Sequence, residues 1–119
     1  MTNTVQRFRF QQLDVYRVTL KLATIVSTAQ IGDAELRDQA TRAVKSVFLN
    51  LSEGLPAQAA GVRRRHFSAA NGSLHEVVAA VDLAAAIGAI APETAARSQA
   101  LALRVKQMLW RLISPAPAG

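Results

Sequence analysis

Apolar residues recur along the chain at spacings of three and four, which is the period of an amphipathic helix. The clearest stripe near the C-terminal end comprises Leu101, Val105, Met108 and Leu112. An earlier stripe comprises Phe67, Ala70, Leu74, Val77, Val78 and Val81. No segment sustains the two-residue alternation of a half-buried strand. The pattern therefore predicts an all-α protein.

Turn and breaker residues divide the chain into four helical segments, at residues 12–30, 33–53, 62–88 and 92–114. Gly32 is suited to end the first helix and Asp33 to cap the second. Gly54 is suited to end the second helix, and Pro92 to occupy the first turn of the fourth. Short connections make neighbouring helices antiparallel, which predicts an up-down-up-down four-helix bundle.

The chain has 119 residues, which is the size of one domain. We expect this domain to cover residues 1–114 and residues 115–119 to form a disordered tail. The absence of cysteine excludes disulfides, thiolate zinc sites and a cysteine nucleophile. No apolar stretch is long enough to cross a membrane, and the first residues lack the apolar core of a secretory signal, so a cytoplasmic location is expected.

The segment 12–30 is apolar around much of its circumference. One row comprises Leu13, Tyr16, Leu20 and Ala23, and a second comprises Val15, Val18, Leu22 and Ile25. Since a four-helix bundle leaves one side of each helix in water, this excess predicts contact with another subunit. Further apolar residues that project away from the main stripes are Leu49, Leu83 and Ile87. Scattered surface apolar residues, which are normal individually, are the alternative explanation.

Charge is the most informative global property. Fourteen Lys and Arg against eight Asp and Glu leave a net charge of +6, and the sequence pI is about 11.1. Such an excess attracts polyanions, which makes nucleic acid the leading class of partner. A basic surface maintained for solubility is the alternative.

Three arginines recur every seven residues in the last segment: Arg97, Arg104 and Arg111. Neighbours would lie about 10 Å apart on one ridge, a spacing that can follow a phosphate backbone. The other basic residues expected to contact nucleic acid are Arg63, Arg64 and Arg65 at the start of the third segment, and Arg17 and Lys21 on the first. The aromatic content is 5%. Because aromatic residues are this few, the prediction is electrostatic binding without base stacking.

A polar stripe runs beside the apolar arc of the second segment and comprises Gln39, Arg42, Ser46, Asn50 and Glu53. On the third segment, Ser73 and Glu76 share their arc with apolar residues. Because an unpaired buried charge costs several kcal/mol, Glu76 is expected to need a donor such as Arg42. These seven residues are predicted to form a structural polar network between helices or between subunits, with ligand binding as the alternative.

Two glutamates also invite a catalytic or metal-binding interpretation. Bundle metal sites need Glu-x-x-His motifs, however, and His75 projects about 100° away from Glu76. His66, which follows three arginines, is predicted to be a surface residue. No nucleophile–base set or glycine-rich phosphate loop occurs. The expectation is a non-enzyme with no catalytic residue, cofactor or metal.

Three segments resemble a known family: residues 36–54 (LRDQATRAVKSVFLNLSEG), residues 70–76 (ANGSLHE) and residues 10–16 (FQQLDVY). They are similar to the four-helix proteins of intervening sequences in large-subunit ribosomal RNA genes. That group includes the accessory variability determinant proteins of diversity-generating retroelements. The seven residues of the predicted polar network match the family pattern.

The resemblance runs from about Phe10 to Ile113 and implies a four-helix protomer, a homopentameric barrel and a basic surface. For the retroelement branch it also implies association with nucleic acid and with a reverse transcriptase. A protein–protein scaffold of the intervening-sequence type, without a direct nucleic-acid role, is the alternative.

Overall fold

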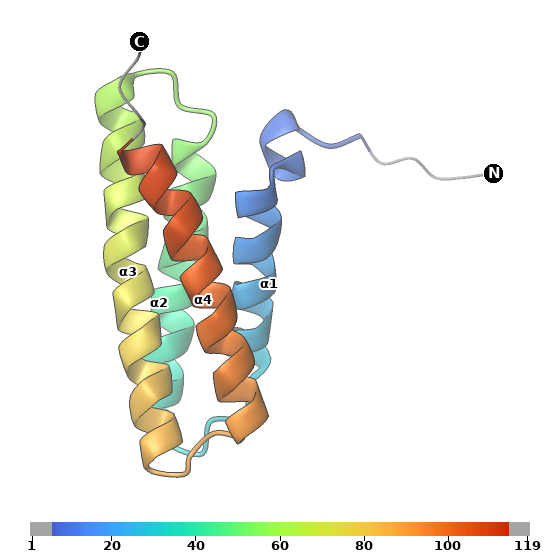
Figure 1. The fold of residues 1–119 in the computed structure, drawn as a ribbon, viewed down its shortest axis with the longest axis vertical. Coiled ribbons are helices and arrows are strands. Elements are labelled where there is room, and N and C mark those ends of the chain that lie inside the picture. The colour runs from blue at the N-terminus through green and yellow to red at the C-terminus, as the bar shows by residue number, and fades with distance from the viewer. Residues whose placement is uncertain (1–5, 115–119) are drawn as a thin grey trace, which may run out of the picture.

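Four helices stand side by side in a computed structural model that describes residues 6–114 (Figure 1). A short 3-10 helix, η1 (Arg9–Gln12), precedes α1 (Asp14–Thr28), α2 (Ala34–Gly54), α3 (Ala60–Ala86) and α4 (Pro92–Ile113). Successive helices run in opposite directions, so the predicted up-down-up-down bundle is confirmed for the protomer. The predicted tail at residues 115–119 lies outside the described residues.

Local signals set several of the helix ends. Asp33 caps α2 by accepting a hydrogen bond from the Leu36 amide at 2.9 Å, and Pro92 is the first residue of α4. Gly88 follows α3 with a φ of +72°, a conformation that glycine adopts without a steric penalty. Gly32 does not end α1, which already stops at Thr28. Its amide instead donates to the Ala89 carbonyl at 2.7 Å and joins the α1–α2 connection to the α3–α4 connection.

The core contains residues from all four helices. Phe67 and Leu74 on α3 and Val105 on α4 are almost completely buried, as their stripes predict. The two buried polar residues within the described chain, Thr19 and Ser98, both donate to a carbonyl one turn earlier in their own helix, at 2.6 and 2.8 Å. No buried side-chain polar atom in residues 6–114 lacks a partner. The core therefore incurs no desolvation cost from unpaired polar groups.

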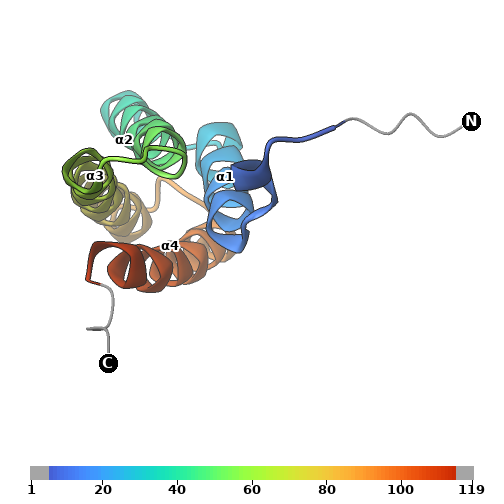
Figure 2. The same cartoon turned by 90° about the horizontal axis from the view of Figure 1, so that it is seen from above.

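The helices form a ring in which α1 and α3 each neighbour α2 and α4 (Figure 2). The α2–α3 contact is the most extensive of the four. Small buried residues on both helices, such as Ala43 on α2 and Ala70 on α3, allow this close packing. Gly54, the last residue of α2, shows how close it is. An added Cβ there would lie 2.6 Å from Phe67 Cε1, so this glycine is required for space.

The apolar circumference of α1 is mostly used within the protomer. Val15, Val18 and Leu22 are buried, and Tyr16 packs on Phe48 of α2 with ring centroids 5.1 Å apart. Several large apolar residues of the described chain remain exposed. Five belong to the sets that the sequence analysis relates to self-association: Leu13, Leu20, Leu49, Leu83 and Ile87. The other three are Phe8, Leu103 and Trp110. The surplus on α1 is thus smaller than the sequence predicts, because α1 contacts both α2 and α4.

Among residues 6–114, no helix is both long enough and apolar enough to cross a membrane.

Candidate nucleic-acid interface

The charged residues divide unequally between two halves of the bundle. Within α1 and α4, six Lys and Arg stand against two acidic residues, an excess of four positive charges. Within α2 and α3, counted with the capping Asp33, six Lys and Arg stand against six Asp and Glu. The rest of the net +6 comes from Arg7 and Arg9, which precede α1. Folding therefore concentrates the positive charge on the α1/α4 side, where the two helices lie side by side (Figures 1 and 2).

The arginine ridge of α4 is solvent-exposed along its whole length. Arg97, Arg104 and Arg111 are all exposed, and none forms an ion pair within residues 6–114. Arg97 lines a shallow hollow with Ile25 and Thr28, which places the start of the ridge beside α1. Arg17 and Lys21 on α1 are exposed as well. A basic face made from these two helices offers guanidinium groups that are free to bind phosphate in a bidentate manner.

Arg63 has a different role from the one predicted from the sequence. Its Nη1 lies 3.1, 2.6 and 3.1 Å from the carbonyl oxygens of Gly54, Leu55 and Ala57, and its guanidinium lies over the Phe67 ring. A cation at the C-terminal end of α2 satisfies carbonyls that the helix leaves unpaired. Arg63 thus stabilises the α2–α3 connection, and these bonds occupy the guanidinium that was predicted to bind phosphate. Its neighbours Arg64 and Arg65 are exposed.

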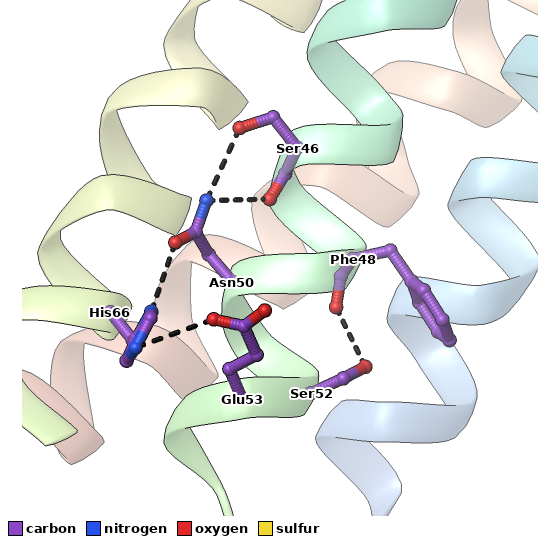
Figure 3. A network of polar contacts seen from close by, with 6 residues as sticks. All are labelled: Ser46, Phe48, Asn50, Ser52, Glu53 and His66. Carbon is purple, nitrogen blue, oxygen red and sulfur yellow. Dashed lines mark hydrogen bonds and ion pairs between the residues drawn. The ribbon is translucent and has the colours of Figure 1, made fainter.

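The polar network forms between α2 and α3 with fewer members than predicted. Ser46 and Ser73 share a hydrogen bond of 2.7 Å between their hydroxyls, which joins the two helices directly. The Asn50 amide donates to the Ser46 carbonyl at 3.0 Å, and Asn50 Oδ1 faces His66 Nδ1 at 3.1 Å (Figure 3). Because the amide oxygen can only accept, the His66 Nδ1 carries a proton and donates. Glu53 Oε2 lies 3.4 Å from His66 Nε2.

Four of these positions differ from the prediction within one protomer. Gln39, Arg42 and Glu76 are exposed and have no hydrogen-bond or ion-pair partner within the described chain, so they do not join the α2–α3 network, and Glu76 is not buried in the protomer. The alternative, a network between subunits, stays a prediction for these three residues. The arc of α3 that carries Glu76 faces solvent in the protomer. His66, predicted to be a surface residue, is a half-buried member of the network. The residues around His66 in the sequence do not reveal this burial, because the contact with Asn50 depends on the register between α2 and α3.

Residues 6–114 contain no cluster of three or more His, Cys, Asp or Glu side chains that could hold a metal ion. Glu53 and Glu76 do not share a site: Glu53 pairs with His66, while Glu76 points into solvent. The side chains that do converge on one face are the cations of α1 and α4.

A four-helix bundle with one strongly basic side and a polar-linked helix pair on the other defines a class of small, basic, all-α proteins. A family model described as 23S rRNA-intervening sequence protein matches residues 11–111. The chain therefore belongs to the 23S rRNA-intervening sequence protein family, as the resemblance of residues 36–54 and 70–76 indicated. A comparison with curated proteins finds no match.

Proposed function

We propose that the protein is a non-catalytic accessory protein of the cytoplasm that binds RNA or DNA by its phosphates, using the α1/α4 basic face. The segregation of charge carries this proposal, because the net charge of the whole chain would be equally consistent with a solvated surface. The α1/α4 half carries six cations and two anions, and the α2/α3 half is neutral. This distribution concentrates the positive potential on a face along which a nucleic-acid strand can lie. Arg97, Arg104 and Arg111 then contact successive parts of one backbone.

Self-association is the second part of the proposal. Leu49 on α2, Leu83 on α3 and Ile87 at the end of α3 are each more than half exposed. Leu13, immediately before α1, and Leu20 on α1 are exposed as well. Two different apolar surfaces on one protomer allow a head-to-tail contact, in which one surface packs on the other surface of the next subunit. Such contacts form a closed ring when the rotation between neighbouring subunits returns to the first subunit. The resemblance implies five copies, and a ring multiplies the basic faces that a single nucleic acid can reach.

Salt-dependent binding tests the nucleic-acid role. The variant Arg97→Gln/Arg104→Gln/Arg111→Gln should bind a single-stranded oligonucleotide more weakly, with a log-log salt slope lower by about 2, since each lost phosphate contact removes about 0.7. The matched control is Arg37→Gln/Arg42→Gln/Lys45→Gln, which removes the same charge from exposed positions on α2. Equal losses in the two variants would show that net charge alone drives binding and would contradict the proposal.

Light scattering tests self-association. The wild-type chain should have the mass of an oligomer at micromolar concentration, and Leu83→Glu should lower that mass because a charge would be buried in the contact. Ala100→Glu, at an exposed position on α4 and so away from the face of α3 that carries Leu83, is the control. A monomeric wild-type chain would refute the proposed ring.

A protein–protein scaffold is the second candidate function, and the exposed leucines favour it. In that case the basic face would contact an acidic or RNA-carrying protein, and the resemblance to the retroelement branch suggests a reverse transcriptase. A complex with a purified reverse transcriptase that survives nuclease treatment would support the scaffold over direct nucleic-acid binding.

A further inference from the structure

Trp110 is an exposed aromatic residue placed among cations on α4. Its side chain is 62% exposed, which is unusual for a residue whose ring favours burial. A shallow hollow of about 490 Å³ is lined by Leu103, Lys106, Gln107, Trp110 and Arg111. The helical spacing explains this grouping, because side chains three and four residues apart lie on the same face. The sequence predicts binding without base stacking, but the helix brings Trp110 between Lys106 and Arg111.

The rim of this hollow is cationic and partly held in place. Lys106 Nζ lies 2.8 Å from His75 Nε2 on α3, and the ammonium must be the donor because it has no acceptor. This contact orients Lys106 beside the hollow. Arg111 belongs both to the hollow and to the arginine ridge. No acidic side chain lines the hollow, so nothing there repels a phosphate.

We propose that this hollow binds one unpaired base of a single-stranded nucleic acid, with the base stacked on the Trp110 ring. The proposal rests on the nucleic-acid function and adds the preferred substrate, a single strand. Arg111 would hold a phosphate while the adjoining base turns toward Trp110, and Lys106 and Gln107 would contact the edge of the base or the sugar. A duplex keeps its bases stacked on one another, so it cannot offer a free base face to the ring.

The intrinsic fluorescence of the protein is a direct probe, because Trp110 is its only tryptophan. A short oligothymidine should quench this fluorescence, whereas an abasic oligonucleotide of the same length should bind with little quenching. Trp110→Leu should weaken oligothymidine binding about tenfold, as expected for the loss of one base–aromatic stack. It should leave abasic binding and the salt slope unchanged, because the phosphate contacts remain. Trp110→Phe should retain most of the affinity.

Phe8→Leu is the comparison variant, since Phe8 is also an exposed aromatic residue that lines a hollow with a cation, Arg9. It should lower oligothymidine affinity less than Trp110→Leu does, and an equal loss would contradict a stacking site specific to Trp110. Equal affinity for base-bearing and abasic strands, with a neutral Trp110→Leu, would overturn the stacking site and leave the phosphate-binding function intact. If neither strand binds, both proposals fall. A lower oligomer mass for Trp110→Leu in light scattering would also overturn the stacking site, because Trp110 would then belong to a subunit contact.

Discussion

The α2/α3 pair and the α1/α4 pair use similar amphipathic helices, but they differ in packing and in charge. The α2/α3 pair is in the closest contact, is joined by the Ser46–Ser73 hydrogen bond and is electrically neutral. The α1/α4 pair has less contact and carries an excess of four positive charges. The comparison shows how one small bundle can separate its tasks. In one half acidic side chains balance the cations, while the other half carries an unbalanced excess of cations that a polyanionic partner can neutralise.

The largest effect on stability should come from Gly54, where α2 meets α3 most closely. Gly54→Ala would place a Cβ within 2.9 Å of two atoms of the buried Phe67 ring, so we expect a loss of about 2–3 kcal/mol in the free energy of unfolding. Chemical denaturation measures this loss. Gly72→Ala on α3 is the control, because an added Cβ meets nothing within 4 Å and alanine favours the helix. A neutral Gly54→Ala would refute the tight packing of this pair.

A smaller loss is expected for Arg63→Gln, which removes the cation from the C-terminal end of α2. Three carbonyl oxygens would lose their donor, and the free energy of unfolding should fall by about 1–2 kcal/mol. Arg64→Gln should leave stability unchanged, since Arg64 is exposed. In the folded protein, Arg63→Gln should leave nucleic-acid binding nearly unchanged, because the Arg63 guanidinium is already bonded to carbonyl oxygens. A stable Arg63→Gln variant with weakened binding would show that Arg63 contacts the nucleic acid.

The Ser46–Ser73 link should be worth about 1 kcal/mol. A double-mutant cycle with Ser46→Ala, Ser73→Ala and the double variant isolates the coupling between them. The same cycle between Ser73 and the exposed Ser68 should give no coupling, because their five-residue spacing places Ser68 about 140° around α3 from Ser73. A coupling near zero for Ser46 and Ser73 would mean that the α2–α3 register depends on apolar packing alone.

The smallest stability change is expected on α1. Arg17→Gln/Lys21→Gln alters two exposed cations with no ion pair in the described chain, so the free energy of unfolding should shift by less than about 0.5 kcal/mol. The salt slope of nucleic-acid binding should nevertheless fall by about 1.4. If the slope is unchanged, the basic face is restricted to α4.

The sequence was a good guide to the helices because their signals are local. Asp33 and Pro92 stand at the helix starts that they predict, and the apolar stripes of α3 and α4 are buried. The candidate site was less predictable, since Arg63, Arg64 and Arg65 have the same side chain and adjacent positions. Their roles differ because only Arg63 points toward the end of α2.

The sequence by itself determined the four helices, their antiparallel order and the excess of positive charge, since periodicity, capping and composition act within short segments. Tertiary structure decided which polar residues have partners. Glu76 is in solvent and His66 is bonded to Asn50 because the register between α2 and α3 sets their surroundings. It also decided that the surplus cations share the α1/α4 side, since helices at opposite ends of the chain become neighbours only when the bundle closes.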